Sequence, residues 1–170
     1  ASQAAKGEGC LFGVATQNNY KTLAASCLAD GHSIIAESPI DVNIAKQVNI
    51  LISDMGLDPS RIVMHPTTAA LGYGMEYVFS IMERARLAAF SGDRMLSMPF
   101  ILFAGQEVWR VREARESPSL GLKWEIATAA AMLPAVTSAS SAFQFLSISS
   151  IAALMRCSVR ASQSVHCRPC

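Results

Sequence analysis

The amino-acid sequence predicts an α/β fold in which a parallel sheet carries helices on its outer side. Short apolar runs, typical of strands that are buried on both faces, alternate with segments that have apolar residues at helical spacing. This alternation is typical of repeated strand–helix units. Of the 170 residues, 51% are hydrophobic and 16% are charged, which excludes a mostly disordered chain.

The first strand–helix unit is expected after a linker over residues 1–9. Residues 10–16 form an apolar run that predicts a buried strand. Asn18 or Asn19 can cap the helix that follows, and Gly31 ends that helix.

The same pattern then continues. Residues 33–38 predict the second strand, Asp41 caps the next helix, and Gly56 ends it. Residues 61–65 predict the third strand, and a long loop over 66–74 follows.

The third helix is expected over residues 75–89, with Glu83, Arg84 and Arg86 on its polar side. Residues 99–104 then predict a fourth strand.

The rest of the domain is expected to be helical. The mixed-charge segment 106–116 predicts one helix, Pro118 breaks it, and residues 124–133 predict a further apolar helix. About four strand–helix units are therefore expected within a domain of residues 10–133.

Ligands of parallel α/β folds bind beyond the carboxyl ends of the strands. The candidate site loops are therefore 16–19, 38–41, 66–74 and 105–107.

Composition excludes several kinds of partner. The net charge of +1 leaves no electrostatic footprint for nucleic acid or an anionic membrane. The mean hydropathy is high at +0.30, but no run of about 18 uncharged apolar residues occurs before Ile126. The sequence also shows no signal-peptide pattern, so a cytoplasmic protein is expected.

Few motifs carry chemistry on their own. His65 ends a predicted strand, where it is a general base, a metal ligand or a hydrogen-bonded loop residue. Gly72 and Gly74 flank Tyr73, in a tight turn or in close contact with a flat ligand. The single C-x-x-C pair at 167–170 is weak evidence for a metal, so no metal ligands are assigned.

A longer set of residues resembles a known family over residues 10–133. The set is Ala15-Thr16, Asn19-Tyr-Lys21, Ser38-Pro-Ile-Asp-Val-Asn43, Lys46-Gln47, Asn49, Pro66-Thr-Thr-Ala-Ala-Leu-Gly-Tyr-Gly74, Glu76-Tyr77, Met82-Glu-Arg84, Arg86-Leu-Ala-Ala89, Gly92-Asp93, Met98-Pro99, Glu107, Trp109, Arg112-Glu-Ala114 and Trp124-Glu125. Together these residues resemble the small (delta) subunit of the corrinoid iron-sulfur protein of the acetyl-CoA decarbonylase/synthase complex. The 66–74 stretch is the most specific part.

The resemblance implies part of a TIM (β/α)8 barrel without catalytic residues of its own. It implies a large partner subunit that holds both the corrinoid (cobalamin) and a 4Fe-4S cluster. It further implies that cobalt accepts a methyl group from a methyl-pterin, through a methyltransferase, and passes it to acetyl-CoA synthase. Whether this chain alone is an enzyme stays open.

The resemblance also implies that the strand-end loops face the corrinoid. The residues expected to contact this cofactor are Thr16, Ser38, Asp41, Asn43, Thr67, Thr68, Gly72, Tyr73 and Gly74. The family usually has Asp before Pro66, where this chain has His65, so this loop is expected to be altered.

The last 37 residues have another composition, with nine serines and no acidic residue. If the codons for residues 134–144 are read one base earlier, they can encode residues that resemble the strand that comes next in the family. Residues 134–170 are therefore expected to be an atypical, out-of-frame tail, with a divergent native tail as the alternative.

Two other functions are kept open. One is a stand-alone pterin-dependent methyltransferase on the same barrel, with Asp41 and Asn43 as its pterin-binding candidates. The other is a truncated product without a function.

Overall fold

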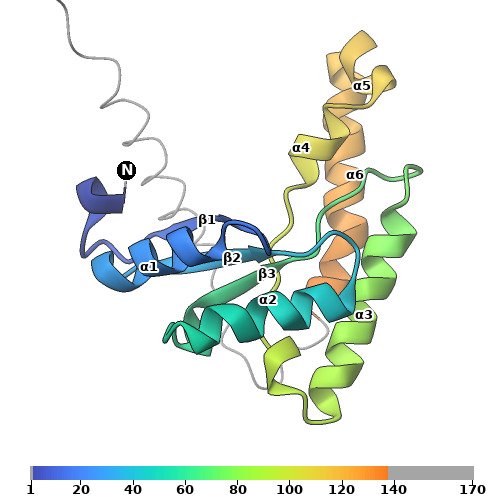
Figure 1. Cartoon of the computed structure of the whole chain (residues 1–170). Coiled ribbons are helices and arrows are strands. Elements are labelled where there is room, and N and C mark those ends of the chain that lie inside the picture. The colour runs from blue at the N-terminus through green and yellow to red at the C-terminus, as the bar shows by residue number, and fades with distance from the viewer. Residues whose placement is uncertain (1, 138–170) are drawn as a thin grey trace, which may run out of the picture.

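The computed structural model describes residues 2–137, which form a three-stranded parallel sheet with helices packed against it (Figure 1). Glu37 pairs with His65, so the last residues of two neighbouring strands lie side by side. The predicted α/β class and parallel sheet are confirmed. The strands, in their order across the sheet, are β1 (Leu11–Ala15), β2 (Ser33–Glu37) and β3 (Ile62–His65).

Local signals set the ends of the two helices that connect these strands, α1 (Tyr20–Asp30) and α2 (Val42–Asp54). Gly31 ends α1 with a left-handed φ of 80°, which glycine adopts without steric cost. The carboxylate of Asp41 caps α2, because it accepts a hydrogen bond of 2.7 Å from the backbone N–H of Asn43. Both of these predicted helix boundaries are confirmed.

The main core lies between the sheet and the helices. Ile34 of β2 and Ile62 of β3 are fully buried and paired in register, and they share a core cluster with Val48 of α2. Burial of each such side chain stabilises the fold by roughly 1.5–3 kcal/mol. The other face is crowded too, because a Cβ atom at Gly13 would lie 2.7 Å from the Cβ of Ile35.

A single parallel bridge between Met64 and Phe100 stands where a fourth strand was predicted over 99–104. Two backbone hydrogen bonds of 2.8 Å flank this bridge. The N–H of Phe103 then donates to Oγ1 of Thr68 at 3.0 Å. The prediction of a full strand is wrong, because a side-chain oxygen takes the backbone donor that a longer ladder would use.

Helix α3 (Met75–Phe90) precedes the bridge. The region after the bridge is helical but differs from the prediction. It forms α4 (Ala104–Val108), α5 (Arg112–Glu116) and α6 (Pro118–Thr137). One continuous helix over 106–116 is wrong, since extended backbone at Val111 separates α4 from α5 and lets Val108 and Val111 share one small core. Pro118 begins α6, a position that proline tolerates because the first helical N–H has no partner in the helix.

Helix α6 extends beyond the segment predicted for it. It begins before residue 124 and is described as far as Thr137, so the expected domain boundary at Leu133 falls inside it. Met132 and Ala135 of α6 are buried against Val78 of α3. Figure 1 shows α3 and α6 side by side at one end of the sheet.

Arg86 of α3 is buried, at 8% exposed, although the helical pattern predicted it on the polar side with the exposed Glu83 and Arg84. Its guanidinium donates to the carbonyl of Met98 at 3.2 Å and lies 4.5 Å from the centre of the Phe100 ring. Burial lowers the pKa of Arg86. The prediction for this residue is wrong, because backbone carbonyls and an aromatic face solvate the cation inside the fold.

The expected linker is partly packed against the domain. It contains the short 3-10 helix η1 (Ser2–Ala5), and the carbonyl of Ser2 lies 3.2 Å from Nε2 of the fully buried His32. The hydroxyl of Ser2 also donates to Asp30. The expected tail from residue 138 onward, with its reading-frame hypothesis and its C-x-x-C pair, lies outside the described residues. None of the helices within residues 2–137 combines the length and the hydropathy that a membrane crossing needs.

Candidate functional site

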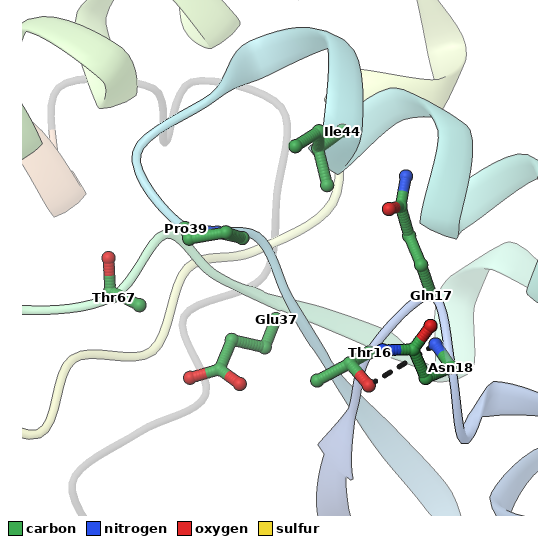
Figure 2. Close-up of a pocket in the computed structure, with 7 residues that line it drawn as sticks. All are labelled: Thr16, Gln17, Asn18, Glu37, Pro39, Ile44 and Thr67. Carbon is green, nitrogen blue, oxygen red and sulfur yellow. Dashed lines mark hydrogen bonds between the residues drawn. The ribbon is translucent and has the colours of Figure 1, made fainter.

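The carboxyl ends of the three strands surround an open hollow of about 340 Å³. This volume is at the low end of the roughly 300–1,000 Å³ that small-molecule sites occupy. Residues from the loops after β1, β2 and β3 therefore meet at one edge of the sheet (Figure 2). The lining residues are Thr16, Gln17, Asn18, Glu37, Pro39, Ile44 and Thr67.

Two of these loops contain residues in the left-handed region of backbone conformation. Ile40 has a φ of 43° and Thr67 has a φ of 63°, and within residues 2–137 they are the two residues other than glycine with positive φ. β-Branched side chains adopt this conformation only at a cost, and such strained residues cluster at ligand sites. Thr67 lines the hollow, and Ile40 directly follows the lining residue Pro39.

Hydrogen bonds within the chain shape the loop after β1. Its backbone N–H at Thr16 donates to Oδ1 of Asn19 at 2.6 Å, and the N–H of Asn18 donates to Oγ1 of Thr16 at 3.4 Å. The amide of Gln17 donates to that of Gln47 on α2 at 2.8 Å. Side-chain bonds of this kind fix a polar turn, so this side of the hollow is preformed.

Glu37 is the one charged residue among those that line the hollow. Its Oε1 atom lies 4.0 Å from Nε2 of His65, and its side chain is 29% exposed whereas that of His65 is 6% exposed. Nδ1 of His65 lies 3.0 Å from the carbonyl of Ile101, and the ring meets that of Phe103 edge-on at 4.8 Å. Of the three roles proposed for His65, the structure shows the hydrogen-bonded one.

The structure divides the residues that were expected to contact a cofactor. Thr16 and Thr67 line the hollow. Ser38 is 2% exposed, and its N–H donates to the carbonyl of His65 at 3.0 Å, so it joins β2 to β3. Asp41 uses its carboxylate to cap α2, and Asn43 is an exposed residue of the first turn of that helix.

The other expected residues lie elsewhere along the 66–74 loop. Thr68 binds the backbone of the bridge segment, and Gly72 and Gly74 take left-handed conformations, with φ of 81° and 96°, that lead into α3. The hydroxyl of Tyr73 donates to both carboxylate oxygens of Glu113, at 2.9 and 2.8 Å. The first part of this loop therefore lines the hollow, and its last part is held by α5.

Electrostatics reflect the contact between Tyr73 and Glu113. The pKa of Glu113 is lowered, first by its own backbone N–H and then by the hydrogen bond from Tyr73. The pKa of Tyr73 is raised because its proton is held by the Glu113 carboxylate.

A second contact holds the same loop, since Thr128 of α6 accepts a hydrogen bond of 3.2 Å from the N–H of Leu71.

Sequence reasoning placed Gln17, Asn18 and Pro39 in candidate site loops without naming them as site residues, and it missed Glu37 and Ile44 altogether. A charged residue at the last position of an otherwise apolar strand is a usable signal for Glu37, because that position faces the site edge. Ile44 has no such signal, since an apolar residue in the first turn of a helix is ordinary core. Within the described residues, no group of three or more His, Cys, Asp or Glu side chains is placed to hold a metal ion.

Comparison with known proteins gives consistent matches. The family model described as CO dehydrogenase/acetyl-CoA synthase delta subunit matches residues 1–144, which extends past Leu133. The chain is 33% identical over 139 residues to the acetyl-CoA decarbonylase/synthase complex subunit delta of Methanocaldococcus jannaschii, covering 78% of this chain and 34% of that protein. It is 36% identical over 141 residues to the subunit of the same name from Methanothermobacter thermautotrophicus, covering 78% and 36%.

A third relative has a similar overlap. The subunit delta of Methanosarcina mazei is 35% identical over 142 residues, covering 75% of this chain and 33% of that protein. The chain spans about a third of the length of the curated relatives it matches. Because the family model covers most of the chain, the chain belongs to the CO dehydrogenase/acetyl-CoA synthase delta subunit family.

Proposed function

We propose that this chain is a non-catalytic part of a cytoplasmic corrinoid iron-sulfur protein. In this role it contacts a large subunit that holds the corrinoid and the 4Fe-4S cluster. The assembly carries a methyl group from a methyl-pterin to acetyl-CoA synthase. Membership of the delta subunit family is the observation that carries this proposal.

The fold proposed for the complete subunit is a TIM barrel, of which this chain holds a part. Each strand pairs with the next one in the sequence, and the bridge at Phe100 extends this order beyond β3. Helices α1 and α2 both pack on β2 and contact each other. Sequential strands with neighbouring helices on the sheet are the arrangement of a (β/α)8 barrel.

The strand-end edge suits contact with the rim of a corrinoid. A hollow of about 340 Å³ is too small to enclose a macrocycle, but it accepts a substituent from the rim of one. Thr16, Asn18 and Glu37 offer hydroxyl, amide and carboxylate groups there. The corrinoid, when bound, supplies the cobalt that accepts the methyl group, and these residues bind its rim and exclude water.

Association with the corrinoid-bearing subunit tests the proposal. We expect the 170-residue chain to co-purify with a large corrinoid iron-sulfur subunit when the two are produced together. A variant with Thr16→Arg and Thr67→Arg would place two bulky cations at the hollow, and we expect it to lose this association. The variant Ser80→Arg, at an exposed position of α3, is the control. Failure of the unmodified chain to associate would contradict the proposal.

The geometry gives less support to a stand-alone pterin-dependent methyltransferase. Asp41 and Asn43 are its pterin-binding candidates, but the Asp41 carboxylate is occupied by the N–H groups of Asn43 and Ile44 at 2.7 and 3.3 Å. Neither Asp41 nor Asn43 lines the hollow. Binding of a methyl-pterin by the isolated chain would favour this alternative.

A further inference from the structure

The side chain of His32 is fully buried between the turn that joins α1 to β2 and the amino-terminal segment, residues 2–9. Its Nδ1 atom accepts a hydrogen bond of 3.3 Å from the backbone N–H of Cys10, and its Nε2 atom lies 3.2 Å from the carbonyl oxygen of Ser2. The ring also packs on that of Phe12, with 4.5 Å between the ring centres. One imidazole therefore contacts the chain at both sides of the segment, which lies beside α1 (Figure 1).

The two hydrogen-bond partners of the ring require its neutral form. A backbone N–H can only donate, so the nitrogen that faces Cys10 carries no proton. A carbonyl oxygen can only accept, so the nitrogen that faces Ser2 carries the one proton of the neutral ring. A second proton would have to bind Nδ1, where it would point at the N–H of Cys10. Two donors would then face each other at a fully buried side chain, which costs free energy.

A neighbouring cation also disfavours a charged ring. Arg61, the last residue of the 3-10 helix η2 (Pro59–Arg61), donates to the carbonyl of His32 and, at 2.9 Å, to that of Cys27. A second positive charge close to this guanidinium is unfavourable. The Cys27 thiol donates to the carbonyl of Ser33 at 3.7 Å, and burial raises its pKa, so it stays uncharged at neutral and acidic pH.

Asp30 is the acidic group at the same contact. Its carboxylate accepts a hydrogen bond from the hydroxyl of Ser2, and its carbonyl accepts one of 3.2 Å from the N–H of Gly7. Lys6 and Glu8 of the segment itself are exposed. Asp30 is therefore the second group, besides the imidazole, whose protonation would change how the segment is held.

The turn around His32 does not depend on the charge of the ring. The backbone N–H groups of Gly31 and His32 both donate to the carbonyl of Cys27, at 3.0 and 2.9 Å. The N–H of Ser33 donates to the carbonyl of Cys10 at 2.9 Å, which continues the pairing of β1 with β2. A change at the ring nitrogens therefore acts on the segment before β1 and leaves the sheet in place.

We propose that His32 is a pH-sensitive latch, which holds residues 2–9 against the domain while its ring is neutral and releases them when its ring is protonated. An imidazole in an unfolded chain takes up its second proton at about pH 6.5. Because release lets the ring bind one more proton, docking of the segment is strongest above this pH and weakens as the pH falls. The docking equilibrium constant is expected to fall by up to about tenfold for each pH unit below about 6.5.

Nuclear magnetic resonance of the full chain, titrated from about pH 7.5 to about pH 5, tests the latch. The chemical shift of the Cε1–H group reports protonation of His32, and the heteronuclear NOE of the amides of residues 3–9 reports release of the segment. We expect both signals to change with the same midpoint. A segment that stays docked while the ring is protonated, or that is released while the ring stays neutral, would overturn the inference.

Variants separate the imidazole from the carboxylate. His32→Gln cannot be protonated in this range, but its amide can donate to the Ser2 carbonyl, so the segment should stay docked throughout the titration. Asp30→Asn keeps an oxygen acceptor for the Ser2 hydroxyl and removes the acid, and its release should follow the same pH dependence as in the unmodified chain. Glu8→Gln, at an exposed carboxylate of the segment, is the matched control and should also release normally.

The opposite pattern would assign the response to the carboxylate. Release of His32→Gln at the pH of the unmodified chain, or a loss of pH-dependent release in Asp30→Asn, would refute the role of the imidazole. If His32→Gln does not fold, the shared midpoint of ring protonation and segment release in the unmodified chain and in Asp30→Asn still decides the question.

Discussion

The indole Nε1 of Trp124 donates a hydrogen bond of 2.9 Å to the backbone carbonyl of Leu71, which joins α6 to the loop after β3. The same loop is bound at the N–H of Leu71 by Thr128 and at Tyr73 by Glu113. The most specific stretch of the sequence is therefore held from its outer side, and only its beginning faces the hollow.

Replacement Trp124→Phe removes the indole donor and keeps an aromatic ring in the small core with Val108 and Ala114. We expect a loss of about 1 kcal/mol in the free energy of unfolding, because the Leu71 carbonyl loses its partner at a partly exposed position. Urea denaturation measures this loss. The control Tyr77→Phe, at a side chain 63% exposed, should change it by less than about 0.5 kcal/mol. Equal stability of Trp124→Phe and the control would contradict the holding role.

Replacement Arg86→Met tests whether the buried guanidinium stabilises the fold. The variant loses the hydrogen bond to the Met98 carbonyl and the contact with the Phe100 ring, but it no longer buries a charge. We expect the lost contacts to outweigh the removed cost of burial, so that the free energy of unfolding falls by about 1–2 kcal/mol. Thermal unfolding of Arg86→Met beside Arg84→Met, an exposed neighbour on the same helix, measures the difference. A more stable Arg86→Met variant would show that the cost of burial is the larger effect.

Replacement Gly13→Ala tests the close approach of β1 and β2. The new Cβ would lie 2.7 Å from the Cβ of Ile35, a distance at which the two strands must shift. Overpacking of this kind costs roughly 1–3 kcal/mol. Gly31→Ala is the comparison, because open space surrounds that Cβ and its cost comes from the φ of 80° alone. The methyl resonances of Ile35 should move in Gly13→Ala only, and an unmoved Ile35 would refute the crowding.

Replacement Tyr73→Phe should raise the pKa of Glu113 part of the way toward its ordinary value, because one of the two hydrogen bonds that lower it is lost. A group whose pKa is lower in the folded chain contributes stability above its unfolded pKa of about 4.3, and this contribution is lost as the pH falls through the folded value. The variant should therefore lose less stability than the unmodified chain on acidification below about pH 4.3. Carbon-13 titration of Glu113 measures the pKa, and Tyr77→Phe should leave it unchanged.

Much of the fold follows from local signals that a single sequence contains. The ends of α1 and α2 depend on Gly31 and Asp41, which act on residues within one turn, and both were predictable. The lack of a full fourth strand over 99–104 was not predictable, because Thr68 takes the N–H of Phe103 from 35 residues away. An apolar run alone cannot show that its backbone donor is bound elsewhere.

The candidate site was predictable as an edge and only partly as a set of residues. Thr16 and Thr67 follow strands and reach the hollow, as expected of strand-end residues. Tyr73 follows the same strand as Thr67, yet it turns outward, because Glu113 of α5 offers it a carboxylate. That partner is 40 residues away, so the contact depends on how the helices pack.

The strictly sequential order of the strands has a consequence for synthesis on the ribosome. Phe12 pairs with Ile34, and Ile34 pairs with Ile62, so each new pairing closes a loop of about 20–30 residues. Closing a loop of this length costs less conformational entropy than pairing strands that lie farther apart in the sequence. These strand–helix units can therefore fold in turn as they emerge, each strand adding to an edge that is already in place.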